Sequence, residues 1–397
     1  MHQLTIARIT TGLFCLLCVV GVCPNVYKTV SMHKKIVDCK GSEACFSRIM
    51  LDTVAKNDLN DGFKFLESVY ADTPSFRPDC HNFTLRVTQV LYLRHPDYLS
   101  LPVAPDIVTC NYGFLQQYPA SILLATHNIA AAQTFCKRVA RSIGGAVPGA
   151  EAECYRGIGR GLPFVDASSQ GDPVRMAAFA LHACKELTSD PNDYGTCLSG
   201  LFNVIGRTEV ARQSGLSVEA SDPMRLCKIQ IDQEARDRCF GNFKATVISM
   251  VDVNDTASAE HSILRLYGEG DSATTNDAIW TIGYEWGRSK LVAGAPFGPA
   301  IAACAALSPA SMHACFQGIS VGLAKHGVPG AQHILMISFC KAARAAIPAL
   351  IASDCPSVQA VGYIRGFYSP KAFGAAYASM KQELGSVAVP DTTSYGF

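Results

Sequence analysis

The apolar residues of this chain follow the spacing of helices rather than that of strands. Strict alternation of apolar and polar residues, which marks half-buried strands, is rare. Alanine-rich stretches over residues 298–308 and 341–352 favour helices, because alanine has the highest helix propensity. Asp172–Pro173 and Ser308–Pro309 predict helix starts, since the capping side chain accepts free backbone N–H groups and proline has no N–H to leave unpaired. The pattern predicts an all-α protein.

A charge-free apolar segment lies close to the N-terminus. Residues 9–22 follow a short basic start, and their length suits the core of a secretory signal peptide better than a membrane span. No A-x-A cleavage motif appears and Pro24 follows closely, so an uncleaved membrane anchor is the alternative. We assign residues 1–30 to a signal peptide or an N-terminal membrane anchor. The rest of the chain is expected to be extracytoplasmic: periplasmic, on the cell surface or secreted.

The cysteine residues predict a disulfide framework. Of the 17 cysteines, 14 follow the N-terminal segment, and an even number behind an export signal is typical of disulfide-bonded proteins. Taken in order, five of the seven odd-numbered cysteines precede lysine, whereas four of the seven even-numbered ones precede an aromatic residue. Because the two kinds alternate, the simplest pairing joins each odd-numbered cysteine to the next one. The predicted pairs are Cys39–Cys45, Cys80–Cys110, Cys136–Cys154, Cys184–Cys197, Cys227–Cys239, Cys304–Cys315 and Cys340–Cys355.

A short glycine element, G-Φ-x-x-G with Φ apolar or aromatic, recurs along the chain. Glycines four residues apart share one helix face and allow a neighbouring helix to approach closely, so we predict helix-to-helix packing at each copy. One copy has no cysteine before it and is interpreted as a degenerate repeat. The four copies are Gly157–Gly161, Gly283–Gly287 (the degenerate one), Gly318–Gly322 and Gly362–Gly366.

The cysteine spacing predicts the architecture. From Cys136 onward the odd-numbered cysteines are 48, 43, 77 and 36 residues apart. Three of these four spacings, 36, 43 and 48, are typical of repeats made of two helices. We predict αα-hairpin repeats, each clamped by a disulfide, that form a solenoid; a closed α/α-toroid is the alternative. Four segments are expected: the signal peptide or anchor over 1–30, an N-terminal helical portion and linker over 31–105, the helical repeat array over 106–370, and a C-terminal helix with a mobile tail over 371–397.

The element "CYRGIGRG" at Cys154 and the rhythm of paired cysteines over residues 110–367 resemble a known group of proteins. This is a loose group of exported prokaryotic helical-repeat proteins with C-Y-x-G-Φ-G-H-G-type elements. The resemblance implies the fold and the compartment and no activity. Arg160 stands where that element usually has histidine. The repeated glycine motifs also look like those of α/α-toroid enzymes, whose zinc-ligating Cys/His signatures this chain lacks.

Composition and charge narrow the function classes. With 49% hydrophobic and 17% charged residues, the chain is not of the disordered class. Lysine and arginine (34) balance aspartate and glutamate (33), so no bulk charge attracts nucleic acid or anionic lipid. C-x-x-C spacing is absent after the N-terminal segment, and no histidine pair has helical metal-site spacing. We expect a protein partner, no nucleic acid, membrane contact only through the N-terminal segment, and no metal or cofactor.

Two arginines occupy the same position within the glycine element. Arg160 and Arg365 each directly precede the second glycine of their copy. Arginine binds carboxylates and phosphates through two parallel hydrogen bonds, so the pair is a candidate anion clamp. The alternative is a set of salt bridges between repeats.

Glu285 is the best candidate for a catalytic carboxylate. It lies between Tyr284 and Trp286 in an otherwise apolar segment. A carboxyl group against aromatic rings can have a raised pKa and act as a general acid, and such rings also stack against sugars. The alternative for Glu285 is a buried ion pair with Arg288.

These observations favour a binding protein over an enzyme. We expect an extracytoplasmic helical-repeat binding or scaffold protein, with an accessory subunit of a membrane-associated assembly as one form of it. The alternatives are a glycan-active α/α-toroid enzyme with Glu285 as acid, and a small-anion-binding protein that uses Arg160 and Arg365. Ring closure, with acids and aromatic residues converging at the mouth, would favour the toroid enzyme.

Overall fold

The computed structural model describes residues 33–169, 172–206, 224–248, 256–267, 272–328, 330–348, 354–368, 370–385 and 389. The proposed signal peptide or anchor over 1–30 and the polar end of the 371–397 segment therefore lie outside the described residues. Within the described part the regular elements are helices and no strand occurs, so the predicted all-α class is confirmed. No described helix combines the length and the apolar composition that a membrane span requires.

Most elements are α-helices, joined by short 3₁₀ turns (η1 to η4) and one π-helical turn (η5). In chain order they are α3 (Glu43–Lys56), α4 (Leu59–Asp72), η1 (Pro74–Asp79), α5 (Cys80–Arg94), η2 (Pro105–Val108), α6 (Gly113–Thr126), α7 (Ile129–Ile143), α8 (Ala150–Gly161), η3 (Leu162–Phe164), η4 (Ala167–Ser169), α9 (Pro173–Leu187), α10 (Pro191–Ile205), α12 (Arg225–Lys228), α13 (Gln233–Ile248), α14 (Thr256–Tyr267), α15 (Ser272–Glu285), η5 (Trp286–Leu291), α16 (Phe297–Ala305), α17 (Pro309–His326), α18 (Gln332–Ala346), α19 (Val358–Phe367) and α20 (Pro370–Leu384).

The predicted helix starts are present. The Asp172 carboxylate accepts hydrogen bonds from the Val174 and Arg175 N–H groups at the start of α9. Helix α17 begins at Pro309 and is followed by Gly327 as its C-cap. The predicted capping by the Ser308 side chain is wrong, because its hydroxyl accepts no hydrogen bond from α17 and instead donates to Glu260 Oε1 at 2.7 Å.

All seven predicted disulfides are confirmed, with Cα–Cα distances from 5.2 to 5.9 Å. Four of them clamp helix pairs as predicted: α7 to α8, α9 to α10, α12 to α13 and α16 to α17. The other three involve turns or loops. Cys39–Cys45 closes a turn at the start of α3, and Cys80–Cys110 ties the first residue of α5 to the segment before α6.

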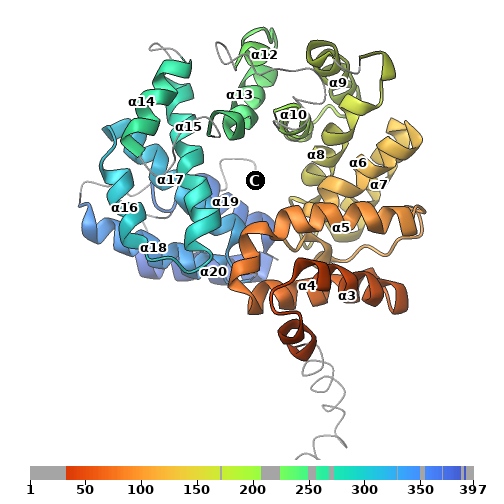
Figure 1. The fold of residues 1–397 in the computed structure, drawn as a ribbon, viewed down its shortest axis with the longest axis horizontal. Helices are drawn as coiled ribbons and strands as arrows, with labels where there is room; N and C mark the ends of the chain where they lie inside the picture. Colours follow the sequence, from red (N-terminus) through yellow and green to blue (C-terminus); the bar gives the residue numbers. More distant parts are fainter. Residues whose placement is uncertain are drawn as a thin grey trace, which may run out of the picture.

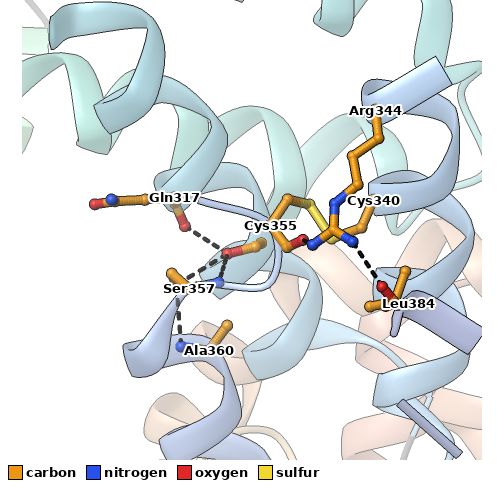
Figure 2. The surroundings of a disulfide bond; sticks show 8 residues. Gln317, Cys340, Arg344, Cys355, Ser357, Ala360 and Leu384 are labelled. Carbon is orange, nitrogen blue, oxygen red and sulfur yellow. Dashed lines mark hydrogen bonds between the residues drawn. A yellow bond between two sulfur atoms is a disulfide. The ribbon is translucent and has the colours of Figure 1, made fainter. Parts of the chain in front are cut away.

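Cys340–Cys355 joins α18 to the loop before α19, and its surroundings anchor that loop (Figure 2). Arg344, one turn after Cys340, donates hydrogen bonds to the carbonyl of Cys355 and, at 3.0 Å, to that of Leu384. Ser357 then caps α19 by accepting from the Ala360 N–H. One arginine therefore connects α18, the disulfide loop and the end of α20.

The helices form two layers along a curved row (Figure 1). In one layer α5, α6, α8, α10, α13, α15, α17 and α19 follow one another, and each packs against the next. The other layer includes α7, α9, α12, α14, α16 and α18, each packed on its partner in the first layer. Elements from the N-terminal part of the chain also contact elements from its C-terminal part. Helix α4 is hydrogen-bonded to α17, and η1 is hydrogen-bonded to η5.

The glycine elements lie at the helix–helix contacts of the first layer. A Cβ atom added to Gly157 on α8 would lie 2.5 Å from the carbonyl oxygen of Leu115 on α6. Gly159 on α8 and Gly200 on α10, which are not part of the predicted copies, would likewise clash with the carbonyls of Cys197 and Arg156. Helix α17 contacts α15 and η5 in the same close way: a Cβ on Gly287 of η5 would lie 2.6 Å from the carbonyl oxygen of Ile319, and one on Gly322 of α17 would lie 2.6 Å from that of Tyr284. The predicted close packing is thus confirmed for the copies on α8, α15 and α17.

Candidate ligand-binding site

Glu285, the candidate acid, forms an ion pair. Its carboxylate accepts from Nε and Nη2 of Arg288, with a shortest distance of 2.5 Å. Arg288 also donates to the carbonyl of Pro78 in η1 at 2.8 Å. The structure thus contains the Glu285–Arg288 ion pair that was the alternative to a catalytic role, although the pair is partly exposed and not buried. Through Arg288 it links η5 to the N-terminal part of the chain.

Tyr284 and Trp286 are built into the helix packing. The Tyr284 ring stacks on Trp280 at 5.4 Å, and its hydroxyl lies 2.7 Å from His326 Nε2. Trp286 is buried at the start of η5, with the Lys290 ammonium 4.8 Å from the centre of its ring. Burial raises the pKa of Tyr284, so its hydroxyl stays protonated and donates to the histidine.

The two candidate arginines lie in different helix pairs. Arg160 is buried on α8 and donates to Asn203 Oδ1 of α10 at 2.9 Å. Arg365 lies on α19, which packs against α17, whereas α8 packs against α6 and α10. Arg160 therefore contacts α10 of the next disulfide-clamped pair and not a helix of its own pair.

A cavity of about 310 Å³ lies between the N-terminal and C-terminal parts of the chain. Its walls are the end of α4, η2 and the segment after it, residues 146–147, the end of α17 and the loop to α18. We call it the α4–α17 cavity. None of the five predicted catalytic or binding residues lines it. Its volume is at the lower end of the range typical of small-molecule sites.

Lys325, the penultimate residue of α17, lines this cavity. Its ammonium lies 4.0 Å from the ring centre of Tyr363 and 5.9 Å from that of Tyr284. Burial acts to lower the pKa of Lys325, but the electrostatic effects of Tyr363 and Tyr284 outweigh it and leave the pKa above its ordinary value. The side chain is therefore charged at neutral pH.

The Lys325 ammonium has aromatic neighbours, and the Glu153 carboxylate, which is paired with Arg156, acts on it from beyond ion-pair distance. No carboxylate in the described part of the chain comes within ion-pair distance of it, and no oxygen there accepts a hydrogen bond from it. The Lys325 side chain is partly buried, and a cation in such a place is normally paired, because desolvation of an unpaired charge is costly. Cation–π contacts offset part of this cost, typically about 0.5–2 kcal/mol.

Two buried residues of the cavity wall have a side-chain amide oxygen without a hydrogen-bond donor among the described residues. Asn111 and Gln332 are 8% and 6% exposed, and both line the cavity wall. Among the described residues, none donates a hydrogen bond to Asn111 Oδ1 or to Gln332 Oε1. Each of these oxygens has less than 1 Å² of accessible surface, so both lie behind the cavity wall rather than at its surface.

An unusual backbone turn holds Asn111 at the cavity. Cys110, Asn111 and Tyr112 all have left-handed φ angles, of 64°, 59° and 59°. Such angles are uncommon outside glycine, and asparagine tolerates them better than most residues. The disulfide to Cys80 and the hydrogen bond between His81 Nδ1 and the Cys110 carbonyl, 3.2 Å long, fix this turn against α5.

Two acidic side chains stand at the edge of the cavity. Glu67 on α4 is exposed, and Asp106 in η2 is partly exposed. Burial and the neighbouring Asp106 carboxylate raise the pKa of Glu67. The cavity therefore combines one cation with several hydrogen-bond acceptors.

The histidines near the site are neutral at neutral pH. Burial and the positive charge of Arg160 lower the pKa of His81 to about 3. Burial, with the charges of Arg288 and Lys325, holds the pKa of His326 well below its usual range. His326 Nε2 consequently accepts the hydrogen bond of Tyr284, and Lys325 is the charged group of the α17 end that lines the cavity.

No protein-family model, curated protein or solved structure matches this chain. The resemblance to exported helical-repeat proteins therefore stays a prediction, and the function has to be argued from the residues of the site.

Proposed function

We propose that this protein is an extracytoplasmic binding protein that holds the anionic group of a small ligand on Lys325 in the α4–α17 cavity. One observation carries the proposal: the partly buried side chain of Lys325 has two tyrosine rings beside its ammonium and no hydrogen-bond acceptor in the described part of the chain. A ligand carboxylate or phosphate would supply the missing charge and hydrogen bonds.

The disulfide framework supports the compartment. Seven cysteine pairs at bonding distance suggest an oxidising environment, since disulfides are rare in reducing compartments. The short loops that they close suit a protein that must stay folded outside the cell or in the periplasm.

We also infer that the hairpins close into an α/α ring rather than an open solenoid. The hydrogen bonds from Tyr70 to His326 and from Arg288 to Pro78 support closure, because each joins segments far apart in the chain. Closure alone would have favoured the toroid enzyme. The ion pair of Glu285 with Arg288 disfavours it, because both carboxylate oxygens already accept hydrogen bonds from the guanidinium.

A second candidate is binding of a protein partner, as in a scaffold or accessory subunit. It is favoured by Ile229 and Ile231, which are 46% and 97% exposed in the turn between α12 and α13. Mild purification of the native protein should then retain a stoichiometric partner, and Ile231→Ser should release it. Copurification that is unchanged in Ile231→Ser would contradict this role for the turn.

The ligand-binding proposal is tested with the full-length chain, exported so that its disulfides form. Amino acids, hydroxy acids, sugar acids and inorganic phosphate are screened by thermal shift against the wild type, Lys325→Met and Lys381→Met. Lys381 is a matched control, because its ammonium also lies over a tyrosine ring, 4.5 Å from that of Tyr377, but outside the cavity. We expect a ligand that stabilises the wild type and Lys381→Met but not Lys325→Met. The same stabilisation in all three proteins would contradict the proposal.

A further inference from the structure

The Lys325 ammonium lies at the inner end of the α4–α17 cavity. Lys325 lines the cavity, whereas the two rings beside its ammonium belong to Tyr363 and Tyr284, which do not line it. The ammonium therefore lies where the cavity borders the inner face of the first helix layer, by which we mean the face turned away from the second layer. A ligand bound to Lys325 can extend to a second group on that inner face.

Arg156 on α8 lies on the same inner face. The disulfide of Cys154 joins α8 to α7 of the second layer. Gly157 packs against α6 on one side, and Gly159 packs against α10 on the other. Successive residues of an α-helix are about 100° apart around its axis, so Arg156 lies about 200° from Cys154, on the face opposite α7.

The Arg156 side chain has hydrogen-bond donors without acceptors. Its Nη1 lies 3.8 Å from Glu153 Oε1, which makes an ion pair but is too long for a hydrogen bond. The other oxygen of Glu153 accepts from Gln116 at 2.7 Å. No atom in the described part of the chain accepts a hydrogen bond from Arg156, although its side chain is only 19% exposed. Nε is enclosed, whereas the two terminal nitrogens keep accessible surface and can bind an anion.

Positive charge gathers around this inner face. Burial lowers the pKa of His81 to about 3, and three positive charges act in the same direction. They belong to Arg160, Arg156 and Lys325. Because electrostatic interactions weaken with distance, all three cations lie near this histidine. One carboxylate, that of Glu153, acts on both Lys325 and Arg156, so these two cations are only partly compensated.

The cations lie next to the cavity, because His81 is attached to its wall. His81 Nδ1 is 3.2 Å from the carbonyl oxygen of Cys110, and Cys110 lines the cavity. At the cavity edge Glu67 is exposed and Asp106 is partly exposed, so water and salt screen their repulsion of an anion. The inner end of the cavity therefore favours a ligand with more than one negative group.

We propose that the ligand is a small dicarboxylate, with one carboxylate on the Lys325 ammonium and the other on the Arg156 guanidinium. A monocarboxylate would leave one of these two cations without an acceptor. Two separate carboxylates suit two cations on different helices, α17 and α8, better than a single phosphate group does. Hydrogen bonds between arginine and a carboxylate are charge-assisted and stronger than neutral ones. This inference rests on the proposed function and names the ligand class of the same site.

The chemical test titrates the exported full-length protein with straight-chain dicarboxylates from malonate to adipate, followed by calorimetry. The best binder is compared with its half-amide, which has nearly the same size and lacks one negative charge. We expect the half-amide to bind at least tenfold more weakly. A half-amide that binds as well as the dicarboxylate would overturn the proposal. Inorganic phosphate that binds more tightly than every dicarboxylate would overturn the assignment of two separate carboxylates.

A variant of Arg156 tests the second cation. Arg156→Gln should weaken binding of the dicarboxylate at least tenfold and leave the affinity of the half-amide nearly unchanged, because the half-amide can use Lys325 alone. Arg156→Lys, which keeps the charge, should restore part of the affinity. Arg94→Gln is the control, since Arg94 is exposed at the end of α5 and does not line the cavity. Equal weakening of both compounds in Arg156→Gln would show a structural effect and overturn this role.

The outcomes separate this inference from the proposed function. If monocarboxylates bind as tightly as dicarboxylates and both depend on Lys325, the dicarboxylate is wrong and the anion site stands. If no anionic compound binds, both proposals fail.

Discussion

The Tyr70 hydroxyl on α4 donates a hydrogen bond to the backbone carbonyl of His326, which lies 256 residues further along the chain at the end of α17. The side chain of His326 in turn accepts from Tyr284 on α15. One residue thus joins the N-terminal part of the chain to two helices of the C-terminal part. Its neighbour Lys325 lines the cavity that this contact helps to enclose.

Tyr70→Phe should lower the free energy of unfolding by about 1–3 kcal/mol, because it leaves the buried His326 carbonyl without its donor. Chemical denaturation measures the effect. Tyr377→Phe is the control, since Tyr377 is only partly buried and a phenylalanine ring there can still contact Lys381. An unfolding free energy equal to that of the wild type would show that the Tyr70 bond contributes nothing.

Gly318→Ala should destabilise the protein by about 1–3 kcal/mol, because the added methyl group would clash with the Trp280 carbonyl and force α15 and α17 apart. Gly374→Ala is the matched control. Gly374 lies inside α20 with no atom near the position of an added Cβ, so the substitution should stabilise by about 0.5–1 kcal/mol. Thermal unfolding compares the two, and equal effects would refute tight packing at the glycine element.

Replacing both Cys136 and Cys154 by serine should cost about 3 kcal/mol of stability, because the bridge closes a loop of 18 residues. Peptide mapping without reduction should recover Cys136 linked to Cys154 in the wild type. A link between Cys154 and Cys184 would contradict the alternating pairing.

Stability should fall on acidification below about pH 6.5, in part because of His326. Its pKa in the folded protein is well below the ordinary value of 6.5 that applies to the unfolded chain. Between these two values the unfolded chain binds a proton that the folded protein does not, so stability is complete above pH 6.5 and is lost as the pH drops. One such group contributes up to about 1.4 kcal/mol per pH unit.

His326→Gln removes this titration, while the amide oxygen can still accept from Tyr284. The plot of unfolding free energy against pH should then be shallower between about pH 6.5 and pH 4 than in the wild type. His261→Gln is the control, since His261 is exposed. A slope that matches the wild type in His326→Gln would rule out this histidine as a source of the acid sensitivity.

Local sequence patterns were sufficient for the helical class, the disulfides and the glycine contacts. Each disulfide closes a short loop, and the residue after each cysteine distinguished the two members of most pairs. The pairing of Glu285 with Arg288 was also accessible, because residues three apart on a helix are neighbours.

The cavity could not be predicted in the same way. Its walls come from α4, η2 and α17, and no local pattern specifies contacts over such separations. In the sequence, Lys325 resembles an ordinary lysine at a helix C-terminus, where it would suit the helix dipole. The shared register of Arg160 and Arg365 indicated equivalent positions in a repeat, but equivalence does not make two side chains converge on one ligand.

The most direct test of the central claim is calorimetric titration of the wild type and Lys325→Met with the best-binding ligand, together with their ligand-free unfolding free energies. Methionine keeps the length of the side chain and packs well against the two tyrosine rings, while it removes a charge that lacks an acceptor. The account predicts that Lys325→Met binds at least tenfold more weakly and is no less stable than the wild type. Equal affinity, or a loss of affinity that only accompanies a loss of folding, would contradict it.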